Sequence, residues 1–132
     1  MAITLDGFLP KENEELMKWL RTGKDGFSYW RKEAAFTLLP HYPLLDLMHA
    51  KRKYDDSYVH LAEINDADSA HFLHGLFLYN MVDEIVLYQL PISYGNGFSL
   101  TDSFRSCRWN LHKVKAYPNN ICRIIYRRIP LL

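Results

Sequence analysis

The sequence predicts an α+β fold with a helical N-terminal half, one buried central helix and a C-terminal, mainly antiparallel sheet. Apolar residues recur at helical spacing through most of residues 11–53, whereas residues 84–129 contain runs rich in Ile, Val, Leu and Tyr. Helices followed by consecutive strands are typical of α+β proteins. The 132 residues suit a single domain, 1–132, that can bury a continuous core.

Three helices are predicted in the first part of the chain. The first covers Lys11–Thr22, where leucine and tryptophan residues share one face and Gly23 follows as a terminating residue. The second begins at the N-cap candidate Ser28 and has to end by Pro40, because proline does not continue a helix. The third is amphipathic and runs over residues 43–53.

The central helix is predicted over Ala67–Met81, after a strand over Tyr58–Ile64. Asn65, Asp66 and Asp68 are the candidate capping residues at its start. Apolar side chains cover most of the circumference, and only the sector with His71 and His74 is less apolar. A helix that is apolar on nearly all sides is packed by neighbours on several faces, so we predict that it is the core helix.

The remaining residues are predicted to form strands. The first strand covers Glu84–Leu90, and Asn96-Gly97 is the strongest two-residue hairpin signal in the chain. This signal predicts a returning strand over Phe98–Phe104. A last hairpin joins Trp109–Ala116 to Ile121–Ile129 across a turn of proline and asparagine residues.

The register of the last hairpin decides which side chains share a face. Placing Lys115 opposite Arg123 gives one apolar face, which includes Val114 opposite Ile124, and one basic face. A shift by one residue would mix charges into both faces. We therefore predict a buried apolar face and an outward basic face. The same register gives the further pairs Ala116 with Cys122, His112 with Tyr126, Lys113 with Ile125, and Leu111 with Arg127.

Charge is divided unevenly along the chain. Seven basic residues and no acidic residue follow Asp102, whereas residues 1–102 contain nine basic and fifteen acidic residues, so that the net charge is only +1. Cations that face one another across two strands repel, and a bound anion turns this repulsion into attraction. The sequence thus predicts a surface for an anion or a partner, made of Lys113, Lys115, Arg123, Arg127, Arg108 and Trp109. Alternatively, these cations pair with carboxylates of the N-terminal half, such as Glu12, Glu14 and Glu15.

These features predict a small intracellular binding protein of the inhibitor, immunity or mobile-element host-takeover type. Its expected partner is a protein with an acidic surface, and nucleic acid is the second choice. The alternative is a small metal-independent ribonuclease, or another nucleic-acid-binding protein, that uses the same basic strands. Such enzymes neutralise the phosphate and transfer protons with Arg, Lys, His and Tyr, and these residue types are supplied here by His112, Lys113, Lys115, Arg123, Tyr126 and Arg127. No nucleophile motif is present, which favours binding over catalysis.

Neither a metal nor a cofactor is expected. Asp68, His71 and His74 recur every third residue, which spreads them over about 120° of a helix, and no HExxH or Cys/His spacing supports a metal site. Cys107 and Cys122 fall on different rungs of the hairpin, so no disulfide is expected between them. The sequence shows no export signal and no apolar run of about 20 residues, and we expect a cytoplasmic protein with reduced thiols.

Overall fold

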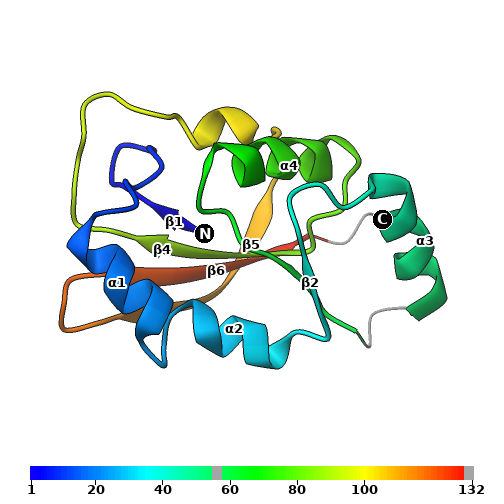
Figure 1. The fold of residues 1–132 in the computed structure, drawn as a ribbon, viewed down its shortest axis with the longest axis horizontal. Coiled ribbons are helices and arrows are strands. Elements are labelled where there is room, and N and C mark those ends of the chain that lie inside the picture. The colour runs from blue at the N-terminus through cyan, green and yellow to red at the C-terminus, as the bar shows by residue number, and fades with distance from the viewer. Residues whose placement is uncertain (55–57, 130–132) are drawn as a thin grey trace.

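The computed structural model, which describes residues 1–54 and 58–129, confirms the predicted α+β fold (Figure 1). Its main sheet has four strands in the order β1-β4-β6-β5. The short β1 (Ala2–Ile3) runs parallel to β4 (Glu84–Gln89). The strand β6 (Cys122–Arg128) is antiparallel to both β4 and β5 (Trp109–Ala116), so the sheet is mixed.

Helices cover both faces of this sheet. On one face, α1 (Glu15–Thr22) and α2 (Phe27–Glu33) bury Met17, Leu20 and Phe27 against Tyr88 of β4. On the other face, α4 (Ala67–Leu78) packs against β1 and β4. The two residues of β1 point to opposite faces of the sheet. Ala2 packs with the buried residues of α1 and α2, and Ile3 packs with those of α4, because successive side chains of a strand alternate between its faces.

A second, two-stranded sheet lies outside the main one. Its strands, β2 (Phe36–Leu38) and β3 (His60–Ala62), are parallel and are connected through α3 (Leu44–Tyr54). The sequence analysis placed a helix up to Pro40 here, and that prediction was wrong. The helix ends at Glu33, and the amides of Ala35 and Phe36 donate to the carbonyl of Val59, at 2.9 and 3.2 Å.

The core helix α4 begins with two reciprocal caps. The Asp66 carboxylate accepts from the Ser69 amide at 2.8 Å, and the Ser69 hydroxyl oxygen accepts from the amide of Asp66 at 3.0 Å. Six of its residues are buried: Ser69, Ala70, Phe72, Leu73, Leu76 and Phe77. The helix ends at Leu78, earlier than predicted, because Asn80 takes the left-handed conformation with φ 57°.

Ser69→Ala is expected to lower the free energy of unfolding by about 1–2 kcal/mol. Ser69 is 1% exposed, and its hydroxyl oxygen accepts from the amides of both Asn65 and Asp66. Alanine leaves both donors without this partner. Chemical denaturation followed by far-UV circular dichroism measures the loss. The control is Ser106→Ala on an exposed loop, where we expect a change within about 0.5 kcal/mol; equal losses for the two variants would contradict the assigned cap.

The predicted hairpin at Asn96-Gly97 does not form. Residues 98–104 contain no strand that returns along β4: Ser99 makes an isolated antiparallel bridge with Phe8, and Thr101–Ser103 form the short 3₁₀ helix η2. The turn residues are present, but the segment after them pairs with the N-terminal part of the chain.

Among the described residues, no helix is both long enough and apolar enough to cross a bilayer.

The register of the last hairpin is confirmed from Lys113 to Ala116. Lys115 lies opposite Arg123, and the three neighbouring pairs also follow the prediction. At His112 the register shifts, so that Leu111 lies opposite Tyr126 and Asn110 opposite Arg127. The predicted pairs of His112 with Tyr126 and of Leu111 with Arg127 were therefore wrong. A bulge of this kind adds one residue to a strand and changes the pairing beyond it.

Candidate functional site

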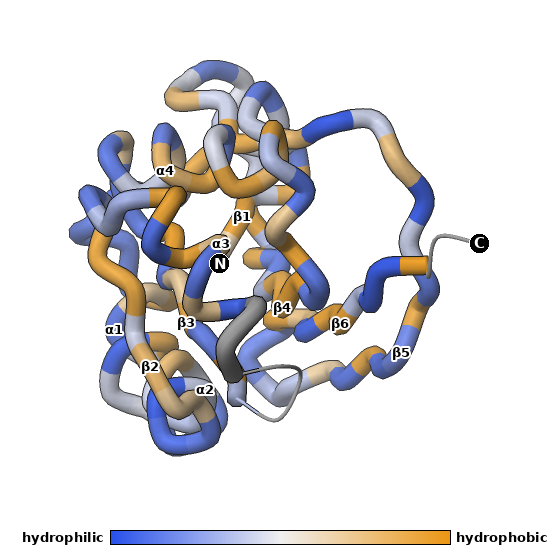
Figure 2. The backbone as a smooth tube through the Cα atoms, turned by 90° about the vertical axis from the view of Figure 1, so that its right-hand side faces the viewer, coloured by the Kyte–Doolittle hydropathy of each residue, from blue (hydrophilic) through white to orange (hydrophobic). Residues whose placement is uncertain are grey.

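The predicted basic surface is divided in the structure. Lys113 and Lys115 are exposed on β5, which lies at the outside of the molecule (Figure 2). Arg123 is half-buried, and its guanidinium lies 5.9 Å from the ring centre of Trp30 in α2. It lies opposite Tyr88, on the sheet face that α1 and α2 cover. The prediction that this face points outward was wrong for Arg123.

The other predicted residues of that surface also have separate environments. Arg127 donates to Glu84 of the neighbouring strand at 3.0 Å, rather than to Glu12, Glu14 or Glu15. Trp109 packs its ring edge-on against Phe77, and Arg108 is exposed. The apolar face was predicted to be buried, yet Val114 is 56% exposed because β5 is an edge strand. Anion binding by the exposed Lys113 and Lys115 stays a prediction.

A cavity of about 580 Å³ lies elsewhere, where loops from distant parts of the sequence meet. Its volume is within the range typical of small-molecule sites. Five segments line it: the stretch before α1, the helix α1, the helix α2, the start of α4, and the loop that follows β4. The lining residues are Leu9, Pro10, Lys11, Glu12, Met17, Arg21, Phe27, Asn65, Asp66, Ala67, Tyr94, Asn96, Gly97 and Phe98.

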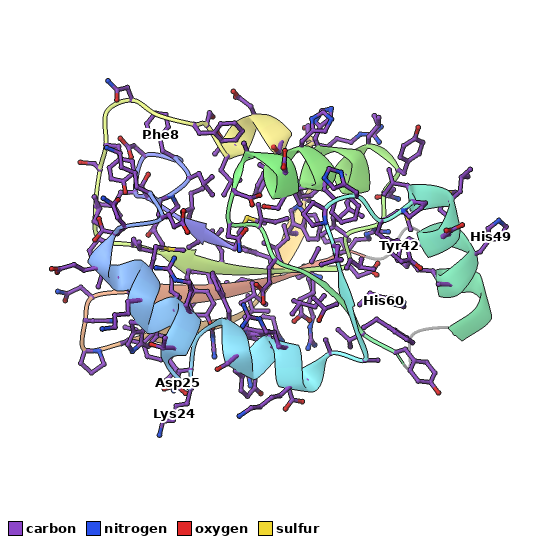
Figure 3. The ribbon with its side chains drawn as sticks, in the orientation of Figure 1. Phe8, Lys24, Asp25, Tyr42, His49 and His60 are labelled. Atoms are coloured by element: carbon purple, nitrogen blue, oxygen red, sulfur yellow. The ribbon has the colours of Figure 1, made fainter. Side chains whose placement is uncertain are left out.

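A tight loop over residues 4–8 leads directly into the N-terminal lining residues Leu9 and Pro10. The Thr4 amide donates to the carbonyl of Phe8, and the Phe8 amide donates to the Thr4 hydroxyl, each at 2.9 Å. Gly7 has φ +89°, a conformation that favours glycine. Phe8 lies where this loop approaches the segment after β4 (Figure 3), and the next amide, that of Leu9, donates to the carbonyl of Phe98.

Asp6 holds the loop after β4, which supplies Tyr94, Asn96 and Gly97 to the lining. Its carboxylate accepts from the amides of Tyr94, at 3.0 and 3.1 Å, and Gly95, at 2.7 Å, and from the Thr4 hydroxyl at 2.7 Å. These hydrogen bonds, with that of Gly95 the strongest, lower the pKa of Asp6 below its usual value. We call this arrangement the Asp6 clip. It explains why Tyr94–Gly97 is not a hairpin turn, since two of its amides are held by the N-terminal loop.

The Asp6 clip is expected to weaken in acid. Because the folded state lowers the pKa of Asp6, the contribution of this carboxylate to stability is complete above the unfolded-state pKa, about 3.9, and is lost as the pH falls through the lower folded-state value. Asp6→Asn should therefore be less stable than wild type at pH 6, and the difference should shrink below about pH 4. Urea unfolding at pH 6 and pH 3 measures this. Asp102→Asn, at an exposed position, is the control, and a difference for Asp6→Asn that is constant with pH would contradict the clip.

Aromatic and charged side chains share the lining of the cavity. The Lys11 amide donates to the Tyr94 hydroxyl at 3.1 Å, and the Lys11 ammonium lies 5.6 Å from the centre of the same ring. Arg21 donates to the carbonyl of Glu12 at 3.0 Å. Together with Phe98, 46% exposed, these residues offer an aromatic surface and several donors and acceptors to a bound molecule.

A shallower groove of about 500 Å³ adjoins this cavity and shares Ala67, Gly97 and Phe98 with it. It adds His71 and His74, the histidines considered in the sequence analysis, and the residues Ser99, Asp102 and Ser103. Within residues 1–54 and 58–129, no group of three or more His, Cys, Asp or Glu side chains could hold a metal ion.

The sequence analysis did not identify the cavity. The signals that could have indicated it were the Asp6-Gly7 pair and the Tyr94-Gly95-Asn96-Gly97 segment, two loop sequences rich in residues that bend the backbone. Each was visible alone, but nothing in the sequence indicates that they meet.

The resulting arrangement of side chains is suited to binding a ligand. The hydrogen bonds from Ser69 lower the pKa of the lining residue Asp66, which makes it a weaker base at neutral pH.

Neither a protein-family model nor a curated protein matches this sequence. Solved structures do resemble the fold. The crystal structure of a putative riboflavin biosynthesis protein from Shewanella sp. PV-4 matches 98% of this chain and 97% of its own, with a TM-score of 0.65 and 13% identity. A pyrimidine reductase-like protein from Corynebacterium diphtheriae matches 67% of this chain and 36% of its own, with a TM-score of 0.50 and 15% identity.

These neighbours correct the predicted function. The leading prediction was an inhibitor, immunity or host-takeover protein that acts through protein–protein interaction. The fold is instead like that of a putative riboflavin biosynthesis protein and of a pyrimidine reductase-like protein, so that prediction was wrong. The alternative, a ribonuclease or another nucleic-acid-binding protein, stays a prediction. The misleading observation was the basic C-terminal segment, whose Arg123 and Arg127 are engaged within the sheet and its covering helix.

Proposed function

We propose that the protein binds a small heterocyclic metabolite, of the chemical type that riboflavin-biosynthesis proteins handle, in the cavity between the Asp6 clip and the start of α4. The observation that carries the proposal is this cavity of about 580 Å³, on a fold that resembles a putative riboflavin biosynthesis protein over nearly the whole length of both chains. The ligand is expected to be a pyrimidine or a flavin-like ring.

The lining supports this ligand class. Tyr94 and Phe98 line the cavity with aromatic rings, on which a planar heterocycle can stack. Asn65 and Asn96 each carry an amide that both donates and accepts, which suits the alternating donors and acceptors at the edge of a pyrimidine or flavin ring. Met17 and Phe27 close the floor as buried apolar residues.

Titration with riboflavin tests the proposal, because binding against aromatic side chains changes flavin fluorescence. We expect saturable binding in the micromolar range. A free aminopyrimidine should compete for the same site. Ala67→Trp should weaken riboflavin binding by about tenfold or more, since Ala67 lines the cavity at the first turn of α4 and an indole there occupies its volume.

The matched control is Asp68→Trp. Asp68 is exposed in the same helical turn but is not among the residues that line the cavity. This variant should bind riboflavin within about twofold of wild type, a difference well below 1.4 kcal/mol. Equal affinities in the Ala67→Trp and Asp68→Trp variants, both folded by circular dichroism, would place the ligand elsewhere and contradict the proposal.

A further inference from the structure

The loop after β4 offers two successive backbone amides of the kind that bind phosphate groups. Successive backbone N–H groups in a turn form a concave site for an anion. Here the amides of Tyr94 and Gly95 are already taken by the Asp6 carboxylate, which is supplied by the chain itself. These two amides are therefore not open to a phosphate.

The start of α4 is closed in part in the same way, because one of its first amides, that of Ser69, is already bound. The first amides of a helix are a ready site for phosphate when they point at a ligand. In α4 the Ser69 amide is bound by the Asp66 carboxylate at 2.8 Å, and the Asp66 amide by the Ser69 hydroxyl. Asp66 also lines the cavity, so it presents negative charge to any bound molecule.

The two cations of the lining, Lys11 and Arg21, do not give the cavity a net positive charge. The Lys11 ammonium lies over the ring of Tyr94, and Arg21 donates to the Glu12 carbonyl. The carboxylates of Glu12 and Asp66 offset these two positive charges within the same lining. The cavity therefore has no surplus positive charge with which to bind a phosphorylated ligand.

A nicotinamide dinucleotide, which a reductase would use as hydride donor, fits poorly here. Its pyrophosphate is normally held by open amides at a helix N-terminus and by a glycine-rich turn. Of the described segments around the cavity, the start of α4 and the loop after β4 are the nearest equivalents. The Ser69 amide of the first is bound by Asp66, and the Tyr94 and Gly95 amides of the second are bound by Asp6.

We infer that the cavity selects unphosphorylated ligands, and that Asp6 and Asp66 are the residues that determine this selectivity. The ligand class rests on the proposed function, whereas the exclusion of phosphate rests on the two carboxylates alone. Riboflavin and flavin mononucleotide (FMN) form a matched pair for the test, since they share one ring system and one side chain and differ by a phosphate.

Calorimetric titrations at about 0.1 M salt, where nearby charges still interact, should find FMN binding at least about tenfold weaker than riboflavin, a difference of about 1.4 kcal/mol. NADPH and inorganic pyrophosphate should show no binding at millimolar concentration. In Asp66→Asn the ratio of the two flavin affinities should fall several-fold, because asparagine keeps the helix cap but removes the charge. Asp6→Asn, which removes the other carboxylate, should shift the ratio in the same direction.

Asp68→Asn is the control for Asp66→Asn. It removes an equal charge from the same helical turn at a position outside the lining, so the ratio should stay near the wild-type value. FMN or NADPH binding to wild type as tightly as riboflavin would overturn the inference, and so would equal effects of Asp66→Asn and Asp68→Asn. Absence of binding for both flavins would contradict the proposed function instead. In that case the titrations with NADPH and pyrophosphate would still test whether the cavity excludes phosphorylated ligands.

Discussion

Tyr88→Ala is expected to lower the free energy of unfolding by about 3–5 kcal/mol, the range for large aromatic truncations in a core. Tyr88 is fully buried in the centre of the sheet, and it is the largest of the fully buried side chains. Its ring makes edge-on contacts with Trp19 of α1 and Phe27 of α2. Alanine therefore leaves a cavity between β4 and both helices. Urea unfolding followed by circular dichroism measures the change.

The hydroxyl of Tyr88 can be tested separately. It accepts from the indole N–H of Trp30 at 2.9 Å and donates to the carbonyl of Asp25 at 2.7 Å. Tyr88→Phe keeps the ring but leaves both partners unsatisfied, at a cost of about 1–3 kcal/mol. Tyr117→Phe is the matched control, because its buried hydroxyl makes no hydrogen bond to the described residues. Equal losses for the two variants would contradict a role of the hydroxyl in joining β4 to α2.

Gly26→Ala should destabilise the fold by about 3 kcal/mol, at the upper end of the range for overpacking. A Cβ atom at Gly26 would lie 2.2 Å from the carbonyl oxygen of Leu20 and 2.8 Å from its carbonyl carbon. These are backbone atoms of α1, and the Leu20 side chain is fully buried, so neither can move away cheaply. The close approach of this turn to α1 thus requires glycine. Thermal and urea unfolding measure the loss.

Gly75→Ala provides the control for that substitution. Its Cβ atom would meet only the end of the Leu44 side chain, at 3.1 Å. Gly75 lies within α4, where alanine is favoured over glycine by about 1 kcal/mol. We expect this variant to be as stable as wild type or more stable. A large loss at Gly75 together with a small one at Gly26 would contradict the packing of both helices.

Sequence patterns predicted the elements whose signals are local. The ranges of β4 and β5 are close to the predicted ones, because alternating or continuous apolar residues bounded by turns define a strand over six to eight residues. The start of α4 was predicted from its capping residues. By contrast, β1 and β2 have two and three residues and are defined only by distant partners, Tyr88 and His60 among them. No local pattern indicates such strands.

The candidate site could not be predicted for the same reason. Its walls are loops that meet only in the folded chain, and the decisive contact joins the Asp6 carboxylate to the amide of Gly95. The prediction of a basic surface was wrong for a different reason, the burial of Arg123. Residue types alone indicated that Arg123 was solvent-exposed, whereas the guanidinium packs against the Trp30 ring, an apolar surface that often accepts arginine. A one-residue bulge at His112 then changed the pairing beyond it.

The position of β4 between β1 and β6 has a consequence for how the chain acquires its structure during synthesis. Ala2 pairs with Tyr88, and Tyr88 in turn pairs with Arg123, so the sheet cannot assemble until the residues of β6 have left the ribosome. Contacts between residues so far apart in sequence slow folding. Until β6 emerges, the apolar faces of α1 and α4 have no complete sheet to cover them, and this interval is when the nascent chain is most prone to aggregation.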